Sequence, residues 1–397
     1  MVDSPGEGGE QRPLPSNTAE AKLLVADDLQ ALIEALQQRG YRVIGPTLDR
    51  QAVVLDDIET IDQLPKGWRD EQDGGSYRLV PSGDNAFFGH TIGPQSWKQY
   101  LHPPHRRLWR LRRDGDGFTK LPDEAVPQPL AFFGVRSCDL AAMVVQDRTF
   151  LESRVIDPSY RDRRRAAFIV AVNCGRAGGT CFCVSMGTGP RAEAGYDLAL
   201  TELIDEERHD FLIEAGSADG STLLRDLPGR DADPADLELA AAIVADTRAA
   251  MGRTLETNGL KERLQENLEH RRWAEVAERC LTCGNCTMVC PTCFCTTVED
   301  RADLDGSHAE RWLRWDSCFT LDFSYLVGGS VRQSARSRYR QWLTHKLADW
   351  HDEFGTSGCI GCGRCITWCP VGIDLTEEAA AIGTSSRKEA QEGSDAA

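Results

Sequence analysis

A short cysteine motif that occurs twice constrains this chain more than any other feature. The motif is Cys-x2-Cys-x2-Cys-x3-Cys-Pro, and its copies run from Cys280 to Pro291 and from Cys359 to Pro370. Three thiolates at this spacing can hold one iron–sulfur cube, while the fourth, followed by proline, turns to the other cube. We therefore predict two [4Fe–4S] clusters with exchanged fourth ligands. The predicted ligands are Cys280, Cys283, Cys286 and Cys369 for cluster 1, and Cys359, Cys362, Cys365 and Cys290 for cluster 2.

A pair of four-thiolate zinc sites is the alternative interpretation of these eight cysteines. Zinc sites usually present two separated Cys-x2-Cys pairs, whereas each copy here places four thiols in one tight run that ends in proline. The spacing therefore favours iron–sulfur clusters. The stretch between Cys290 and Cys359 is also much longer than the connection in a small bacterial ferredoxin. This length indicates a helical dicluster domain of an electron-transfer subunit.

Length, charge and the total number of cysteines narrow the class of protein. The 397 residues predict two or three domains, and the formal net charge of −17 argues against nucleic acid or an anionic membrane surface as the main partner. The sequence has no apolar stretch long enough for a membrane span, and its first residues lack the layout of a secretory signal. We therefore expect a cytoplasmic protein whose fifteen cysteines are mainly metal ligands rather than disulfides.

Hydrophobic periodicity predicts an α/β domain over residues 19–233 and a mainly helical, ferredoxin-type dicluster domain over residues 234–376. The first domain is expected to begin with a helix from Ala19 to Gly40. Short strands are predicted at 42–44, 52–55, 77–80, 130–135 and 167–172. Helices are predicted at 234–251 and 259–279, and disordered tails at 1–18 and 377–397.

Four further cysteines suggest a third metal site in the α/β domain. Cys138 and Cys174 each follow an apolar run that is typical of a buried strand in a largely parallel sheet, and Cys181 and Cys183 lie in a glycine-containing loop. Groups just past the carboxyl ends of parallel strands line the crevice where ligands bind. A third [4Fe–4S] cluster is the first choice for this set. Structural zinc and unligated buried thiols are the alternatives.

The last three cysteines, Cys293, Cys295 and Cys318, have no assigned role. Three thiols can hold a further metal only with a ligand that is not cysteine or with a cysteine from another set. Packing around the clusters is the expected role for at least one of them. Between Arg311 and Lys346 the sequence is also strongly basic. These cations either offset the negative charge of the clusters or form a solvated helix face.

Sequence motifs that would indicate a catalytic centre are missing. The chain has neither the Gly-x-Gly-x-x-Gly pattern of a dinucleotide site nor the phosphate-binding loop that ends in Gly-Lys-Ser/Thr. The glycine-rich segment from Met186 to Pro190 is interpreted as a turn. The cysteine pairs that would hold nickel in a large hydrogenase subunit are absent as well. We therefore expect no catalytic residues and no flavin in this chain.

Several motifs occur along the chain in the order of one known family. They are Gly134-Val135-Arg136-Ser137-Cys138-Asp139-Leu140, Asn173-Cys174, Thr180-Cys181-Phe182-Cys183, Ser185-Met186-Gly187-Thr188-Gly189-Pro190, Cys290-Pro291-Thr292-Cys293-Phe294-Cys295, Trp315-Asp316-Ser317-Cys318 and Gly361-Cys362-Gly363-Arg364-Cys365. With these motifs the chain resembles, from about residue 20 to 375, the family of sulfhydrogenase β subunits, which belong to group 3 [NiFe]-hydrogenases, and anaerobic sulfite reductase A subunits. The family often has proline where this chain has Ser137, but the difference removes no thiol.

The resemblance implies an iron–sulfur electron-transfer subunit in a soluble, multisubunit oxidoreductase. One partner would be a flavoprotein subunit that reacts with NAD(P)H, and the others would be the small and large subunits of a [NiFe]-hydrogenase. A sulfite reductase subunit in place of the hydrogenase is the closest alternative. Two others remain: the α/β domain binds flavin and acts itself, as in the β subunits of deazaflavin-reducing hydrogenases, or the chain is a redox sensor or an assembly scaffold.

Overall fold

An eight-stranded mixed sheet forms the centre of the first part of the chain. The computed structural model describes residues 20–122 and 128–383. The strand order is β12-β1-β11-β10-β9-β8-β2-β3. The strands are β1 (Ala21–Val25), β2 (Arg42–Asp49), β3 (Ala52–Asp57), β8 (Leu130–Arg136), β9 (Phe168–Val172), β10 (Leu198–Ile204), β11 (His209–Ala215) and β12 (Arg230–Asp231).

The sheet is parallel only in its middle. β2, β8, β9 and β10 pair in parallel, whereas β1, β3, β11 and β12 join by antiparallel pairing. The expectation of a largely parallel sheet was therefore wrong for its edges. It is right for β8 and β9, because both strands are almost fully buried and so carry the continuous apolar runs of a covered parallel sheet.

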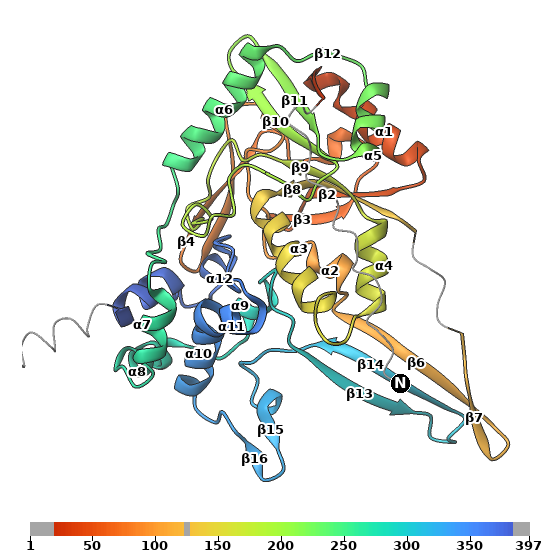
Figure 1. Cartoon of the computed structure of the whole chain (residues 1–397), viewed down its shortest axis with the longest axis vertical. Helices are drawn as coiled ribbons and strands as arrows, with labels where there is room; N and C mark the ends of the chain where they lie inside the picture. The colour runs from red at the N-terminus through yellow and green to blue at the C-terminus, as the bar shows by residue number, and fades with distance from the viewer. Residues whose placement is uncertain (1–19, 123–127, 384–397) are drawn as a thin grey trace, which may run out of the picture.

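Helices cover both faces of this sheet (Figure 1). On one face, α1 (Gln30–Gln38) and α5 (Ala218–Asp226) pack into a hydrophobic core that contains Leu32 and Leu224. On the other face lie α2 (Lys98–Leu101), α3 (Ser137–Phe150) and α4 (Pro158–Ala166), and the core there includes Trp97 and Tyr160. α6 (Pro234–Ala249) packs on β10 and β11 through a smaller cluster. It therefore joins the sheet layers, although residues 234–251 were expected in the helical domain.

Two predictions about local structure near the chain ends differ from the structure. The helix expected from Ala19 to Gly40 is the strand β1, the 3₁₀ turn η1 (Ala26–Leu29) and then α1, because residues 21–25 pair in register with β11. The second tail was predicted to start at residue 377, but residues 375–383 are helical and bury Ala379 and Ile382. The predicted tail at 1–18 and the remainder of the second lie outside the described residues.

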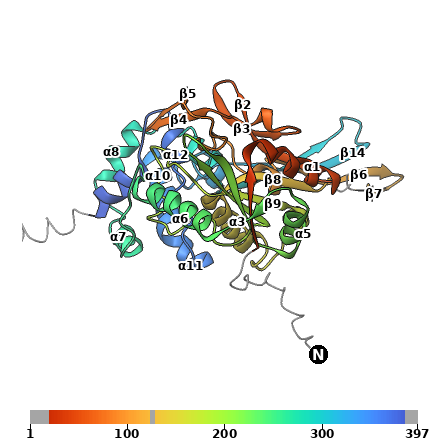
Figure 2. The same cartoon turned by 90° about the horizontal axis from the view of Figure 1, so that it is seen from above.

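A four-stranded antiparallel arm projects from the body of the molecule (Figures 1 and 2). Its strand order is β13-β14-β6-β7. β6 (His105–Asp114) and β7 (Gly117–Lys120) come from the first part of the chain, and β13 (Thr296–Ala302) and β14 (His308–Trp315) from the second. At its base, Arg106 forms an ion pair with Asp157, the residue that caps α4. The arm therefore links the two predicted domains through one sheet, and the second domain is not purely helical.

Short helices surround the duplicated motif at the other end of the molecule (Figure 2). The predicted helix at 259–279 is two helices, α7 and α8, separated by residues 267–271. Trp273, Tyr339 and Trp342 form the centre of their core. The elements are α7 (Leu260–Glu266), α8 (Arg272–Arg279), α9 (Asn285–Met288), η3 (Asp322–Ser324), β15 (Tyr325–Leu326), β16 (Gly329–Ser330), α10 (Ala335–Thr344), the π-helix η4 (His345–Asp349), α11 (Trp350–Phe354) and α12 (Arg364–Thr367).

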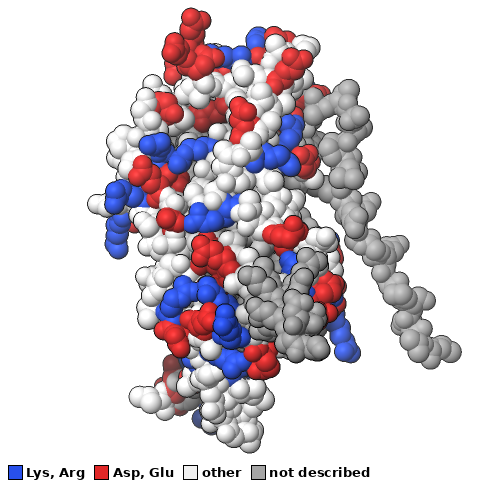
Figure 3. Space-filling model, turned by 90° about the vertical axis from the view of Figure 1, so that its left-hand side faces the viewer, with Lys and Arg blue, Asp and Glu red and all other residues white. Residues whose placement is uncertain are grey.

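A hairpin of β4 (Trp68–Asp73) and β5 (Ser76–Pro81), preceded by the 3₁₀ turn η2 (Ile61–Gln63), reaches from the first part of the chain to α12. Its turn at Gly75 donates a backbone hydrogen bond to Ile366. Basic and acidic side chains are interspersed on the face shown in Figure 3, which gives that face no single sign of charge. Among the described residues, no helix is long and apolar enough to cross a membrane.

Candidate iron–sulfur centres

The four cysteines predicted for cluster 1 line one pocket. Cys280 follows α8, Cys283 and Cys286 flank the start of α9, and Cys369 comes from the second copy of the motif. The loop turns through left-handed backbone at Thr282 and Gly284, and a side chain on Gly284 would press against the Ser317 hydroxyl. Cys283 is exposed, so this pocket reaches the surface.

Two backbone amides beside this pocket point at the sulfurs of predicted ligands. The amides of Thr282 and Ile373 donate to the sulfurs of Cys280 and Cys369, at 3.4 Å each. Burial, followed by the thiols of Cys280 and Cys369, holds the pKa of Cys286 well above its usual value. The distant Cys369 thus meets the first motif, as the exchanged arrangement requires.

The four cysteines predicted for cluster 2 also lie close to one another. Burial first, and then the neighbouring thiols of Cys359, Cys362 and Cys290, raise the pKa of Cys365 well above its usual value. The Gly361 amide approaches the Cys359 sulfur at 3.5 Å. Gly361 and Gly363 have left-handed backbone and lie directly against the carbonyls of Phe182 and Thr180. These glycines therefore let the second motif pack against the loop of Cys181 and Cys183.

A buried lysine, Lys346, contacts the cysteine that crosses over from the first motif. Its Nζ donates to the Cys290 sulfur (3.3 Å), the Thr292 hydroxyl (3.1 Å) and the Gly358 carbonyl (3.0 Å). Burial alone lowers the pKa of Lys346, but Cys290 and Cys293 outweigh it and hold the pKa well above its usual value. Lys346 therefore places a positive charge beside cluster 2. The basic character of the 311–346 segment pointed to this region but not to this residue.

The four cysteines of the α/β domain line a second pocket. β8 and β9 are parallel neighbours, so Cys138 at the start of α3 and Cys174 after β9 leave the same edge of the sheet. Cys181 and Cys183 complete the set, and Cys362 of the second motif lies in the same wall. Burial, then the neighbouring Cys174 and Cys362, raise the pKa of Cys183 to about 12.

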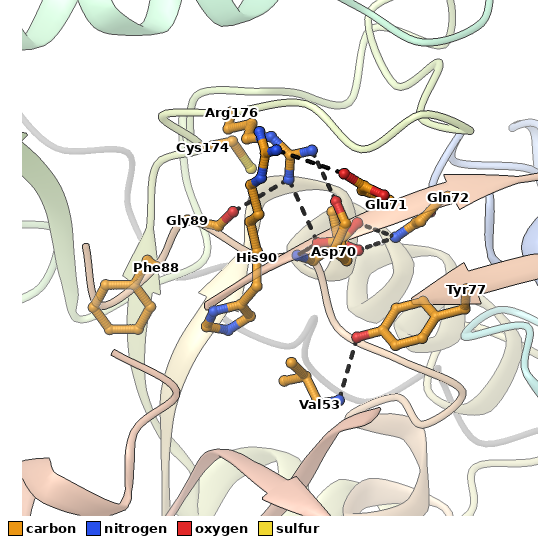
Figure 4. Close-up of polar contacts among 12 residues, drawn as sticks. Val53, Asp70, Glu71, Gln72, Tyr77, Phe88, Gly89, His90, Cys174 and Arg176 are labelled. Atoms are coloured by element: carbon orange, nitrogen blue, oxygen red, sulfur yellow. Dashed lines mark hydrogen bonds and ion pairs between the residues drawn. The ribbon is translucent and has the colours of Figure 1, made fainter. Parts of the chain in front are cut away.

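Charged residues from several segments surround this second pocket (Figure 4). Arg136 approaches the Cys174 sulfur at 4.0 Å and donates to the carbonyls of Phe88 (2.9 Å) and His90 (2.8 Å). Arg176 donates to the Asp70 carbonyl at 2.8 Å. His90 also lines the pocket, and both of its ring nitrogens are buried and lack a hydrogen-bond partner. Arg136 and Arg176 each lie two residues from a predicted ligand in the sequence. Asp70 and His90 instead come from distant segments, so no local pattern connected them with this pocket.

A buried ion pair joins this pocket to the second motif. Arg364, which lies between Cys362 and Cys365, makes two hydrogen bonds to the Asp139 carboxylate, at 2.9 and 3.0 Å. The two side chains are only 6% and 1% exposed. Burial lowers the pKa of Arg364, but Asp139 and Cys362 outweigh it and hold the pKa well above its usual value. Asp139 follows the predicted ligand Cys138, and Arg364 precedes the predicted ligand Cys365. These positions were the only sign in the sequence that the two residues belong to the site.

The three unassigned cysteines gather near Lys346. The Cys293 thiol contacts the Cys290 thiol. This contact, and then burial, raises the pKa of Cys293 well above its usual value. The Cys318 thiol lowers the pKa of Cys295 to about 7 through a hydrogen bond. The prediction that at least one of these thiols only packs around the clusters stays open.

Sulfur is the donor expected for iron–sulfur clusters, and five cysteines line each of the two pockets. Within the described ranges, no group of three or more His, Cys, Asp or Glu side chains closes around a point where a single metal ion would sit. A four-iron cube holds its thiolates at its corners, farther apart than the ligands of one zinc ion with Zn–S bonds of about 2.3 Å. The wide, thiol-lined pockets thus fit the larger group.

Comparison with known proteins agrees with this chemistry. Residues 279–373 match the family described as 4Fe-4S dicluster domain. The chain is also 29% identical, over 342 residues, to sulfhydrogenase 2 subunit beta of Pyrococcus furiosus, a match that covers 84% of this chain and 90% of that protein. The resemblance predicted from the motifs is confirmed. Because 342 residues are many more than the dicluster segment contains, the similarity to the sulfhydrogenase subunit includes the α/β domain.

Proposed function

We propose that the chain is the iron–sulfur electron-transfer subunit of a multisubunit oxidoreductase. In this proposal it relays electrons between a flavoprotein that oxidises or reduces NAD(P)H and a [NiFe]-hydrogenase module. The similarity to a sulfhydrogenase β subunit supports the hydrogenase module. The flavoprotein follows from the chemistry, because a hydride donor delivers two electrons and a cluster accepts one at a time.

The observation that carries the proposal is that a cysteine of one set also lines the pocket of the neighbouring set. Cys365 of the predicted cluster 2 also lines the pocket of cluster 1. Cys362, three positions after Cys359 in the same motif copy, lines the pocket of the third set. Cluster 2 would therefore lie between the other two, and the three sets form a continuous series. An electron relay needs such a series of neighbouring sites, whereas a structural metal site does not.

The iron–sulfur clusters supply one-electron carriers when they are bound. The chain would hold them through its cysteine thiols, of which Cys183, Cys290 and Cys359 are buried. Lys346 beside Cys290 and Arg364 beside Cys362 place positive charge where each added electron brings negative charge, and so favour the reduced state. At the outer end, Cys283 is exposed, which gives a partner protein access to the edge of cluster 1.

The same relay would serve an anaerobic sulfite reductase, so the partner must be identified directly. Anaerobic purification of the complex from its host, followed by identification of the subunits, separates a hydrogenase from a sulfite reductase. Flavin extracted from the isolated chain would instead favour the interpretation in which the α/β domain acts itself.

Electron transfer through the chain tests the proposal. The anaerobically isolated protein should contain at least about eight iron and eight sulfide, and about twelve of each with a third cluster. NAD(P)H with the partner flavoprotein should bleach the visible absorbance of the clusters. A protein that contains zinc in place of iron, or clusters that the reduced flavoprotein cannot reduce, would contradict the relay. The second result is the one expected of a sensor or scaffold.

A further inference from the structure

The three unassigned thiols meet at the base of the arm because of the pairing of its strands. Cys293 and Cys295 lie directly before β13, and Cys318 lies shortly after β14. Thr296 pairs with Trp315, and the Asp316 amide donates to the Cys295 carbonyl at 2.8 Å. The hairpin therefore closes with the three cysteines at one end. There the side chains of Cys295 and Cys318 lie next to each other.

Two buried lysines from different parts of the chain face these thiols. Lys98, from α2, is 4% exposed, donates to the Cys293 carbonyl at 3.0 Å and lies 3.8 Å from the centre of the Trp315 ring. Lys346, from η4, is 3% exposed and donates to the Cys290 sulfur. Burial lowers the pKa of Lys98, and the nearby thiols of Cys293 and Cys290 counter this effect.

Burying two ammonium groups is costly unless negative charge accompanies them. Their direct contacts are sulfur, hydroxyl, carbonyl and ring groups, which offer dipoles but no full negative charge while the thiols stay protonated. Cluster 2 would supply charge next to Lys346 through Cys290. Lys98 contacts the far side of the group through the Cys293 carbonyl, so a negatively charged iron–sulfur centre held there would balance it locally.

We propose that Cys293, Cys295 and Cys318 hold a further iron–sulfur centre, next to cluster 2, with Lys98 and Lys346 as its counter-charges. Cys290 remains a ligand of cluster 2. Three thiolates are the ligand number of a three-iron cluster, or of a four-iron cluster with one iron that lacks a protein thiolate. Because this centre lies at the base of the arm, it would exchange electrons with cluster 2 from the side. It would not be another step in the series of clusters that leads to Cys283.

The iron content of single variants tests this centre in the full-length protein, prepared anaerobically with its partner subunits. Cys293→Ser, Cys295→Ser and Cys318→Ser keep the side-chain size but remove the ligand. Each should lose the same three to four iron atoms and the same component of the electron paramagnetic resonance spectrum. Thr320→Ala, on the same loop as Cys318, is the matched control and should lose none.

Cys138→Ser separates this proposal from the third cluster of the α/β domain. It should remove a different spectral component and leave the proposed centre in place. The proposal is overturned if the three variants retain the wild-type iron content, since the thiols then only pack or form a redox pair. It is equally overturned if the metal lost is zinc, or if the lost signal is that of cluster 2.

Lys98→Met provides a readout that does not depend on removing a ligand. Without the positive charge, the proposed centre should be harder to reduce, so its midpoint potential should fall in a redox titration while the potential of cluster 1 stays unchanged. A purely structural role of Lys98 would shift no single component in this way. Unchanged potentials in a protein with wild-type iron content would count against the proposal.

Discussion

The buried ion pair of Arg364 and Asp139 ties the second motif to the helix that carries Cys138, and we expect its loss to open this junction. Its two hydrogen bonds measure 2.9 and 3.0 Å, and both side chains are more than nine-tenths buried. Asp139→Asn leaves the guanidinium buried without its carboxylate. Removing one partner of a buried pair costs about 3–5 kcal/mol. This corresponds to a population of locally open molecules that is higher by a factor of roughly 10² to 4 × 10³.

Amide hydrogen exchange measures this opening in the full-length, cluster-loaded protein. Protection should fall in α3 and around Gly363, and less in β10 and β11 on the far side of the sheet. The pair Arg311–Asp300 on the arm is a matched control, because it also has two short hydrogen bonds, at 2.6 and 2.7 Å, but its side chains are 43% and 58% exposed. Asp300→Asn should reduce protection far less, because an exposed ion pair contributes little to stability.

A double variant separates the energy of the pair from the penalty of an unpaired charge. Asp139→Leu with Arg364→Met replaces the pair by apolar groups and should recover most of the protection lost in Asp139→Asn. If Asp139→Asn reduces protection no more than Asp300→Asn, the pair does not close this junction and the reasoning is refuted. If the double variant is as open as the single one, the lost stability comes from packing rather than from the unpaired guanidinium.

Three further predictions concern the cysteine sets and the glycines between them. Cys138→Ala or Cys183→Ala should remove about four iron atoms and make the α/β domain sensitive to protease, since a site built from distant segments contributes to folding; unchanged iron would show that these thiols only pack. Gly361→Ala places a Cβ 2.6 Å from a carbonyl oxygen at a φ of +69° and should speed iron release to a chelator far more than Gly40→Ala, where φ is +85° and space is open. Cys290→Ser should disturb the spectrum of the cluster held by Cys359, Cys362 and Cys365, and a loss confined to the other cluster would contradict the exchange of ligands.

The sequence predicted best what is encoded locally. The spacing of the duplicated motif defined two cysteine sets that the structure brings together across the chain. The apolar runs before Cys138 and Cys174 identified two neighbouring buried strands, because a strand covered on both faces must be apolar throughout. The position of both cysteines at one sheet edge then followed from the parallel pairing.

The sequence could not predict what depends on pairing between distant segments. β6 alternates arginine with apolar residues and pairs with β14 roughly two hundred positions later, so neither strand signals the arm by itself. The tail beyond residue 377 looks polar, yet Glu378 is fully buried because Arg272 and Arg279 bind its carboxylate. Lys98 and Lys346 are indistinguishable from surface lysines until the fold encloses them.

The second motif explains why the three cysteine sets form one unit. Between Cys359 and Cys365 the chain supplies three predicted ligands of cluster 2. In the same stretch, Gly361 accepts a hydrogen bond from the Phe182 amide, at 2.8 Å, in the loop of the third set, and Arg364 binds the residue next to Cys138. The separation between neighbouring sets is thus fixed by covalent spacing and buried contacts rather than by docking. We therefore expect electron transfer within the chain to depend little on partner binding. Regulation should act at the exposed end near Cys283, where a partner must approach.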